Sequence, residues 1–140
     1  KEYEKEVFIL SLKIKEITKV TNSFYPESTY LQFINLEENF PNLKNNIKNE
    51  QKLLPISQYE TIEELLIDGN EQGLTHIVID QSQKQDNLRK EFLIKIYKNE
   101  NKYNFLKKIY DSNNEGFNYK LKIFEIDYKL FNQHIEIINK

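Results

Sequence analysis

The chain has 140 residues, a length that fits one domain with a substantial hydrophobic core. Hydrophobic residues make up 39% and aromatic residues 13% of the chain, which argues against global disorder. The 20 basic residues include a single arginine, Arg89, and they are mixed with 22 acidic residues to a net charge of −2. Nucleic-acid binding normally needs a basic face with arginines, so we expect no nucleic-acid partner.

Further exclusions follow from residue types that the chain lacks. Without cysteine, disulfide, zinc–thiolate and thiol chemistry are not available. No apolar run approaches the roughly 18 residues of a membrane span and no signal peptide is visible, so we expect the chain itself to be soluble. The chain contains no methionine and begins with Lys1, whereas an intact gene product begins with methionine. We therefore expect a piece excised from a longer protein, with a processed mature chain as the alternative.

The N-terminal part predicts one helix and one strand. Apolar residues recur at helical spacing over Tyr3–Ile17, with lysines and glutamates between them. Because the pattern lasts only two heptads, we interpret it as a helix that covers a sheet, with a coiled-coil helix as the alternative. Lys19–Ser23 follows as a short strand rich in β-branched residues.

The next segment predicts a buried helix, a polar loop and a second strand. Pro26 suits the first position of a helix, and the strongly apolar run to Leu36 predicts that this helix is buried. Asn39–Lys52 is rich in asparagine and lysine and predicts a surface loop. Leu53–Ser57 predicts a short strand that is interrupted or edged by Pro55.

The stretch Thr61–Asp80 predicts the centre of the fold. Thr61 and Glu64 fit a capping box, in which each side chain accepts a hydrogen bond from a free backbone N–H at the helix start. Gly73 sits where a left-handed residue would end this helix. Leu74–Ile79 is short, β-branched and nearly all apolar, as expected of a strand that is covered on both faces.

The C-terminal part predicts one more helix, over Asn87–Lys98, followed by a hairpin. Two strands, Phe105–Asp111 and Phe117–Asp127, are joined by a loop of turn residues, Ser112–Gly116. The remaining residues, Tyr128–Lys140, predict a tail with one turn of helix and a short extended piece.

The order of these elements predicts the fold class. Strands that alternate with helices imply a parallel sheet with right-handed crossovers. The terminal hairpin adds an antiparallel strand at an edge of that sheet. We therefore predict a single α/β domain over residues 1–140, a Rossmann-like three-layer sandwich with a mostly parallel sheet and a C-terminal antiparallel hairpin.

The residue types that most often form functional sites mainly exclude kinds of site from this chain. Gly69, Gly73 and Gly116 form neither a dinucleotide fingerprint nor a P-loop, so we expect no nucleotide and no other cofactor. His76 and His134 have no histidine or cysteine partner at ligand spacing, so we expect no metal. We interpret His76 as a packed core residue, with a ligand or general base as the alternative. No Gly-x-Ser-x-Gly elbow is present, and we assign no catalytic residue.

A candidate ligand site lies where the predicted parallel strands end, because ligands of open α/β sheets bind beyond the carboxyl ends of the strands. The alternative is that these polar residues form turns, caps and surface ion pairs, which is their commonest use. The candidate residues are Asn22, Ser23, Tyr25, Ser57, Tyr59, Asp80 and Arg89.

Several stretches resemble a known family. They are Leu54–Leu66, Gly73–Asp80, Asn22–Ser28, Lys102–Ser112 and Gly116–Tyr128, and together they span most of the chain. They are similar to the C-terminal domain of archaeal membrane glycosyltransferases that resemble the dolichyl-phosphate-mannose–protein mannosyltransferases. None of the stretches is a motif with a mechanism of its own.

This resemblance implies a role without catalysis. In that family the catalytic acid lies near the first membrane spans, in a portion that this chain does not include, so no catalytic residue is carried over. The resemblance implies an accessory domain on the extracytoplasmic face of a membrane-anchored parent enzyme. Its expected partners are the membrane-embedded portion of the parent chain and an acceptor protein or lipid-linked sugar.

Two other functions remain open at this point. One is a small-molecule-binding or regulatory α/β domain that lacks a nucleotide motif and uses the strand ends described above. The other is a stand-alone enzyme, which we rank last because the sequence offers no catalytic constellation.

Overall fold

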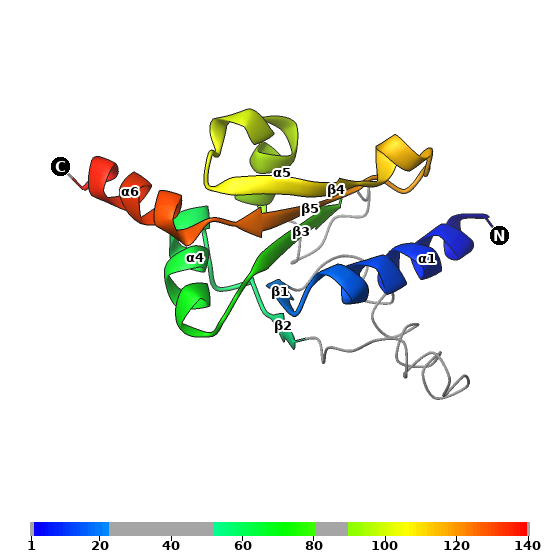
Figure 1. Ribbon diagram of the computed structural model, residues 1–140, viewed down its shortest axis with the longest axis horizontal. Helices are drawn as coiled ribbons and strands as arrows, with labels where there is room; N and C mark the ends of the chain where they lie inside the picture. The colour runs from blue at the N-terminus through cyan, green and yellow to red at the C-terminus, as the bar shows by residue number, and fades with distance from the viewer. Residues whose placement is uncertain (1, 23–51, 81–89, 140) are drawn as a thin grey trace.

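A computed structural model describes residues 2–22, 52–80 and 90–139, with side chains from residue 5 onward in the first of these ranges (Figure 1). The predicted helix that begins at Pro26 and nearly all of the predicted loop Asn39–Lys52 lie outside the described residues.

The described elements follow the predicted order of helices and strands. The helices are α1 (Glu2–Ile17), α4 (Ile62–Glu71), α5 (Glu91–Lys98) and α6 (Tyr128–Ile138), with short 3-10 helices η1 (Glu100–Lys102) and η2 (Ser112–Glu115). The strands are β1 (Val20–Asn22), β2 (Lys52–Leu54), β3 (His76–Asp80), β4 (Leu106–Asp111) and β5 (Leu121–Ile126). No described helix is long and apolar enough to cross a membrane.

The strands form one mixed sheet in the order β2-β1-β3-β5-β4. Strands β1, β2 and β3 are parallel, whereas β5 runs antiparallel to both β3 and β4. The α/β class and a C-terminal antiparallel hairpin at one end of the sheet are therefore confirmed, with β4 at the edge and β5 inside.

The burial of the two hairpin strands explains this order. Strand β5 has buried apolar side chains on both faces, such as Ile123 on one and Phe124 on the other, and it therefore suits the interior of the sheet. Strand β4 carries the exposed Lys107 and Ile109, and its register with β5 shifts between Lys108 and Tyr110. Exposed charge and a β-bulge are typical of an edge strand, the place that β4 takes.

Helices cover both faces of the sheet, each over its own hydrophobic cluster. On one face α4, α5 and α6 enclose the larger cluster, which includes Ile77, Ile79, Phe124 and Phe131. On the other face α1 packs Val7, Leu10 and Ile14 against Val78, Leu121 and Ile123. The predicted role of Tyr3–Ile17 as a sheet-covering helix is thus confirmed.

The C-terminal end of α4 explains the spacing of two glycines. Gly73 has φ +82°, and its N–H donates to the carbonyl of Asn70 at 3.2 Å, while Leu74 N–H donates to the carbonyl of Gly69 at 2.8 Å. This pair of bonds is a Schellman motif, which confirms the predicted left-handed stop. The motif folds Leu74 back onto Gly69, where an added Cβ would lie 2.6 Å from Leu74 Cδ2.

The sequence predicted that the C-terminal segment is a tail with one turn of helix. This prediction is wrong, since the segment forms the 11-residue helix α6. The Asp127 carboxylate caps this helix by accepting a hydrogen bond from Leu130 N–H at 3.0 Å. The buried ring of Phe131 meets Phe105 edge-on, with centroids 5.2 Å apart. His134 bonds to Glu63 of α4 at 2.8 Å, so tertiary contacts hold this helix in place.

The contact between Gly69 and Leu74 gives a stability prediction. We expect Gly69→Ala to destabilise the fold by about 1–3 kcal/mol, because the new methyl group must displace Leu74 in a packed core. Urea denaturation followed by circular dichroism measures this change. The exposed neighbour Asn70 provides the control, since Asn70→Ala should be neutral or slightly stabilising by helix propensity. Equal effects of the two substitutions would contradict the packing argument.

Candidate functional site

The structure places two of the predicted site residues, Asn22 and Asp80, at the carboxyl ends of the neighbouring strands β1 and β3, where each bonds a different partner. Both side chains are buried. The Asn22 amide donates to the carbonyl of Val78 at 2.9 Å and accepts a hydrogen bond from Val78 N–H at 2.7 Å. The Asn22 side chain therefore continues the β1–β3 ladder beyond the single register pair, Thr21 with His76.

Asp80 takes part in a second network, which joins the hairpin to α1. The Tyr119 hydroxyl donates to the Asp80 carboxylate at 2.8 Å. The backbone N–H groups of Tyr119 and Asn118 donate to the two carboxylate oxygens of Glu6, at 2.7 and 3.0 Å. Sequence reasoning missed Glu6 and Tyr119, because no local pattern signals a contact between residues more than a hundred positions apart.

The other predicted site residues do not join this pair. Tyr59 is buried in the larger core cluster, whereas Tyr119 belongs to the cluster under α1 on the opposite face. Burial, reinforced by the nearby Asp68, raises the pKa of Tyr59 above its ordinary value. Ser57 is exposed, and Ser23, Tyr25 and Arg89 lie outside the described residues.

A compact ionic cluster, also missed by sequence reasoning, lies on the face covered by α5. Glu100 accepts from Lys108 at 2.9 Å with one carboxylate oxygen and from Lys122 at 2.7 Å with the other. Lys108 also reaches Asp111 at 3.0 Å. Burial alone would raise the pKa values of Glu100 and Asp111, but hydrogen bonds from the lysines bring both below their ordinary values. The four groups alternate in sign and neutralise one another.

Tyr97 borders this cluster. Its ring lies under Lys122, with Nζ 4.1 Å from the centroid, and its carbonyl accepts from the same Nζ at 2.9 Å. Burial, then the charges of Asp111 and Asp80, raises the pKa of Tyr97 to about 12. A phenol with this pKa stays protonated near neutral pH, so it does not serve as a general base.

His76 is buried at the start of β3, with Nδ1 2.6 Å from Thr75 Oγ1. Burial lowers the pKa of His76, and the nearby Glu125 opposes that shift. Among the described residues no group of three or more histidine, cysteine, aspartate or glutamate side chains could hold a metal ion.

The polar side chains near the carboxyl ends of β1 and β3 thus bond backbone groups and one another across elements that are distant in sequence. Comparison of the chain with protein-family models, with curated proteins and with solved structures finds no match.

The Asn22 bridge gives a second prediction. We expect Asn22→Ala to leave Val78 N–H and C=O without these partners and to cost about 1–3 kcal/mol for each group. Urea denaturation measures the loss. Asn101 is exposed, so Asn101→Ala should change the free energy of unfolding by less than about 0.5 kcal/mol. A small effect of Asn22→Ala would show that other groups or water replace the bridge.

A third prediction concerns pH. Because His76 has a lowered pKa in the folded state, the unfolded chain binds a proton first as the pH falls below about 6.5. The free energy of unfolding should then fall by at most about 1.4 kcal/mol per pH unit, until folded His76 is protonated too, and this contribution is fully present above pH ~7.5. Urea denaturation from pH 5.5 to 8 tests this, with His76→Gln as the comparison. A difference between wild type and variant that does not change with pH would contradict the prediction.

Proposed function

We propose that this chain is a non-catalytic accessory domain of a membrane glycosyltransferase that resembles the dolichyl-phosphate-mannose–protein mannosyltransferases. In this proposal the domain has a Rossmann-like three-layer arrangement and lies on the extracytoplasmic side of the membrane. It supports the handling of an acceptor protein or a lipid-linked sugar, while the chemistry takes place in the membrane-embedded portion of the parent chain.

The position of the resembling segments in the fold supports this proposal. Gly73–Asp80 contains β3, Lys102–Ser112 contains β4, and Gly116–Tyr128 contains β5. Leu54–Leu66 runs from the end of β2 through the capping box at Thr61 into α4. The resemblance therefore covers three strands that are neighbours in the sheet and one helix that packs on them, which is what a shared domain would give.

One observation carries the non-catalytic part of the proposal. The protein's own structure engages the buried polar groups at the strand ends and the partly buried carboxylate of Glu100 in η1. Asn22 bonds Val78, Asp80 accepts from Tyr119, and Glu100 bridges two lysines. Residues used in this way join elements of a scaffold, whereas a catalytic group must meet a substrate.

The proposal is tested first by the purified chain and by its gene. We expect the 140-residue chain to unfold cooperatively in circular dichroism and to transfer no mannose from dolichyl-phosphate-mannose to an acceptor peptide. We expect the reading frame upstream of Lys1 to encode several apolar spans of about 20 residues. Sugar transfer by the purified chain would overturn the non-catalytic role, and an upstream frame without such spans would overturn the membrane parent.

A second experiment distinguishes the accessory role from small-molecule binding at the strand ends. A ligand that binds the folded chain tightly raises its melting temperature by mass action. A metabolite that raises it in the wild type but not in Asp80→Asn would favour the binding role. Glu71→Gln, a substitution at an exposed position of α4, serves as the matched control.

A further inference from the structure

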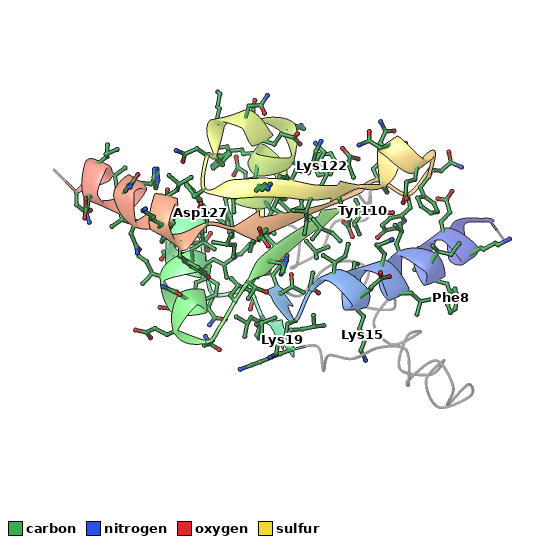
Figure 2. All side chains as sticks on the ribbon, viewed as in Figure 1. Phe8, Lys15, Lys19, Tyr110, Lys122 and Asp127 are labelled. Carbon is green, nitrogen blue, oxygen red and sulfur yellow. The ribbon has the colours of Figure 1, made fainter. Side chains whose placement is uncertain are left out.

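A groove lies at the end of the sheet opposite to Asn22 and Asp80. It has a volume of about 680 Å³ and is formed where β4 begins, β5 ends and α6 starts. This volume is in the range of roughly 300–1,000 Å³ that small-molecule sites occupy. Asp127 in the groove and Tyr110 near α1 mark the two ends of the sheet in Figure 2.

The walls of the groove belong to regular structure. Leu106 pairs with Ile126 and Lys107 pairs with Glu125 in the β4–β5 ladder. Asp127 N–H continues the pairing by donating to the carbonyl of Phe105 at 2.8 Å. The paired hairpin and the helix start fix the backbone positions of these residues, whereas a ligand would have to order the exposed side chains of Lys107 and Glu125.

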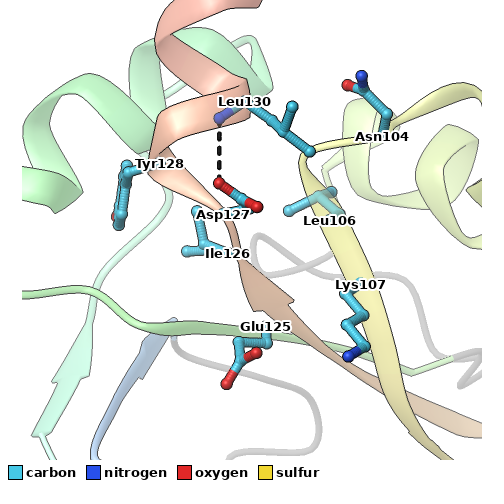
Figure 3. Close-up of a pocket in the computed structure, with 8 residues that line it drawn as sticks. All are labelled: Asn104, Leu106, Lys107, Glu125, Ile126, Asp127, Tyr128 and Leu130. Atoms are coloured by element: carbon cyan, nitrogen blue, oxygen red, sulfur yellow. Dashed lines mark hydrogen bonds between the residues drawn. The ribbon is translucent and has the colours of Figure 1, made fainter.

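The polar side chains of the groove provide both donors and acceptors. Lys107 and Glu125 are exposed, and Asn104 lies at the rim (Figure 3). Among the residues that the structure describes, these three side chains have no hydrogen-bond partner within the chain. Asp127 uses one carboxylate oxygen for the Leu130 N–H, as the dashed line in Figure 3 marks.

Apolar and aromatic residues also line the groove. Leu106 and Ile126 are buried, while Leu130 and Tyr128 are partly exposed. The Tyr128 hydroxyl donates to the carbonyl of Leu74 at 2.7 Å, which fixes the orientation of its ring. A fixed aromatic ring beside aliphatic surface suits the C–H faces of a ligand whose edges carry hydroxyl groups.

The charge of the lining narrows the class of ligand. Glu125 and Asp127 outnumber Lys107, so a phosphate or other anion would meet net negative charge. Two carboxylates, one of them used as a helix cap, are too few for a Ca²⁺ site, which needs six to eight oxygen ligands. A neutral molecule with several hydroxyl groups can use the amide, the ammonium and the carboxylates together.

We propose that this groove binds a neutral polyhydroxylated ligand of the saccharide class. The amide of Asn104 and the ammonium of Lys107 donate to hydroxyl oxygens, while Glu125 and Asp127 accept from hydroxyl groups. The ring of Tyr128 and the side chain of Leu130 pack against the apolar face of a sugar ring. This site does not depend on the proposed parent enzyme, because it is argued from the lining of the groove alone.

The test uses ¹H–¹⁵N NMR titration of the full 140-residue chain with methyl α-mannopyranoside, maltotriose and chitotriose. Because the groove is open and its polar groups are hydrated, we expect a Kd on the order of 1 mM for at least one of them. The amide shifts should be confined to residues 104–107 and 125–130. Sodium phosphate, at the same concentration as the saccharide, should leave the chemical shifts of these amides unchanged.

Variants decide whether the lining is responsible. Lys107→Ala and Glu125→Gln should each weaken saccharide binding by about tenfold or more, as expected when a hydrogen bond to a charged group is lost. Lys129→Ala, an exposed lysine of α6 outside the groove, should bind as the wild type does. The proposal is overturned if no saccharide shifts these amides at a concentration of about 50 mM, which is roughly 50 times the expected Kd. It is also overturned if phosphate shifts them, or if both groove variants keep full affinity.

This result is independent of the outcome for the proposed function. Transfer of mannose by the purified chain would overturn the accessory role and leave the groove untouched. Absence of saccharide binding would overturn the groove proposal without bearing on the reading frame upstream of Lys1.

Discussion

Strand β3 is the constraint on which the rest of the fold depends. All five of its residues are buried, and it is paired with β1 on one side and β5 on the other. A strand without an exposed face needs a layer above and a layer below. Its alternate residues Ile77 and Val78 enter different clusters, one covered by α4, α5 and α6 and the other by α1. The layered arrangement follows from this one strand.

Polar side chains then fix how the layers are joined. Asn22 extends the short β1–β3 ladder, Glu6 ties α1 to the loop before β5, and Glu100 connects Lys108 to Lys122. Each of these groups is fully or partly buried, so an unpaired donor or acceptor there would be costly. The same satisfaction of hydrogen bonds that stabilises the fold makes these groups poor candidates for chemistry. The groove beside α6 differs, because its polar groups face solvent.

Local patterns predicted most of the elements. The capping box at Thr61 and the left-handed Gly73 were read correctly, because caps depend on residues that are close in sequence. The sequence did not predict which hairpin strand lies inside the sheet, since the order of strands is decided by long-range burial. Helix α6 was missed because contacts with residues distant in sequence stabilise it. Phe131 packs against Phe105, and His134 bonds to Glu63.

The candidate site was predictable only in part. The rule that strands end at ligand sites led to Asn22 and Asp80, which the structure does bring to one edge of the sheet. This rule could not show that the Asn22 side chain is hydrogen-bonded to the backbone of Val78. It also could not show that Tyr59 lies on the face of the sheet opposite to Tyr119. The ionic cluster and the groove depend on which side chains meet across β4 and β5, and a single sequence does not reveal that register.

The interior position of β5 has a consequence for how the chain folds. Residues 121–126 fill the space between β3 and β4, yet they are made after both of these strands. Until they are synthesised, β3 presents an unpaired apolar edge of the kind that invites aggregation. Pairing across such a separation in sequence is also slow, because the loop must close before any contact is gained. Of the five strands in this sheet, the one that is made last is therefore the one that completes it.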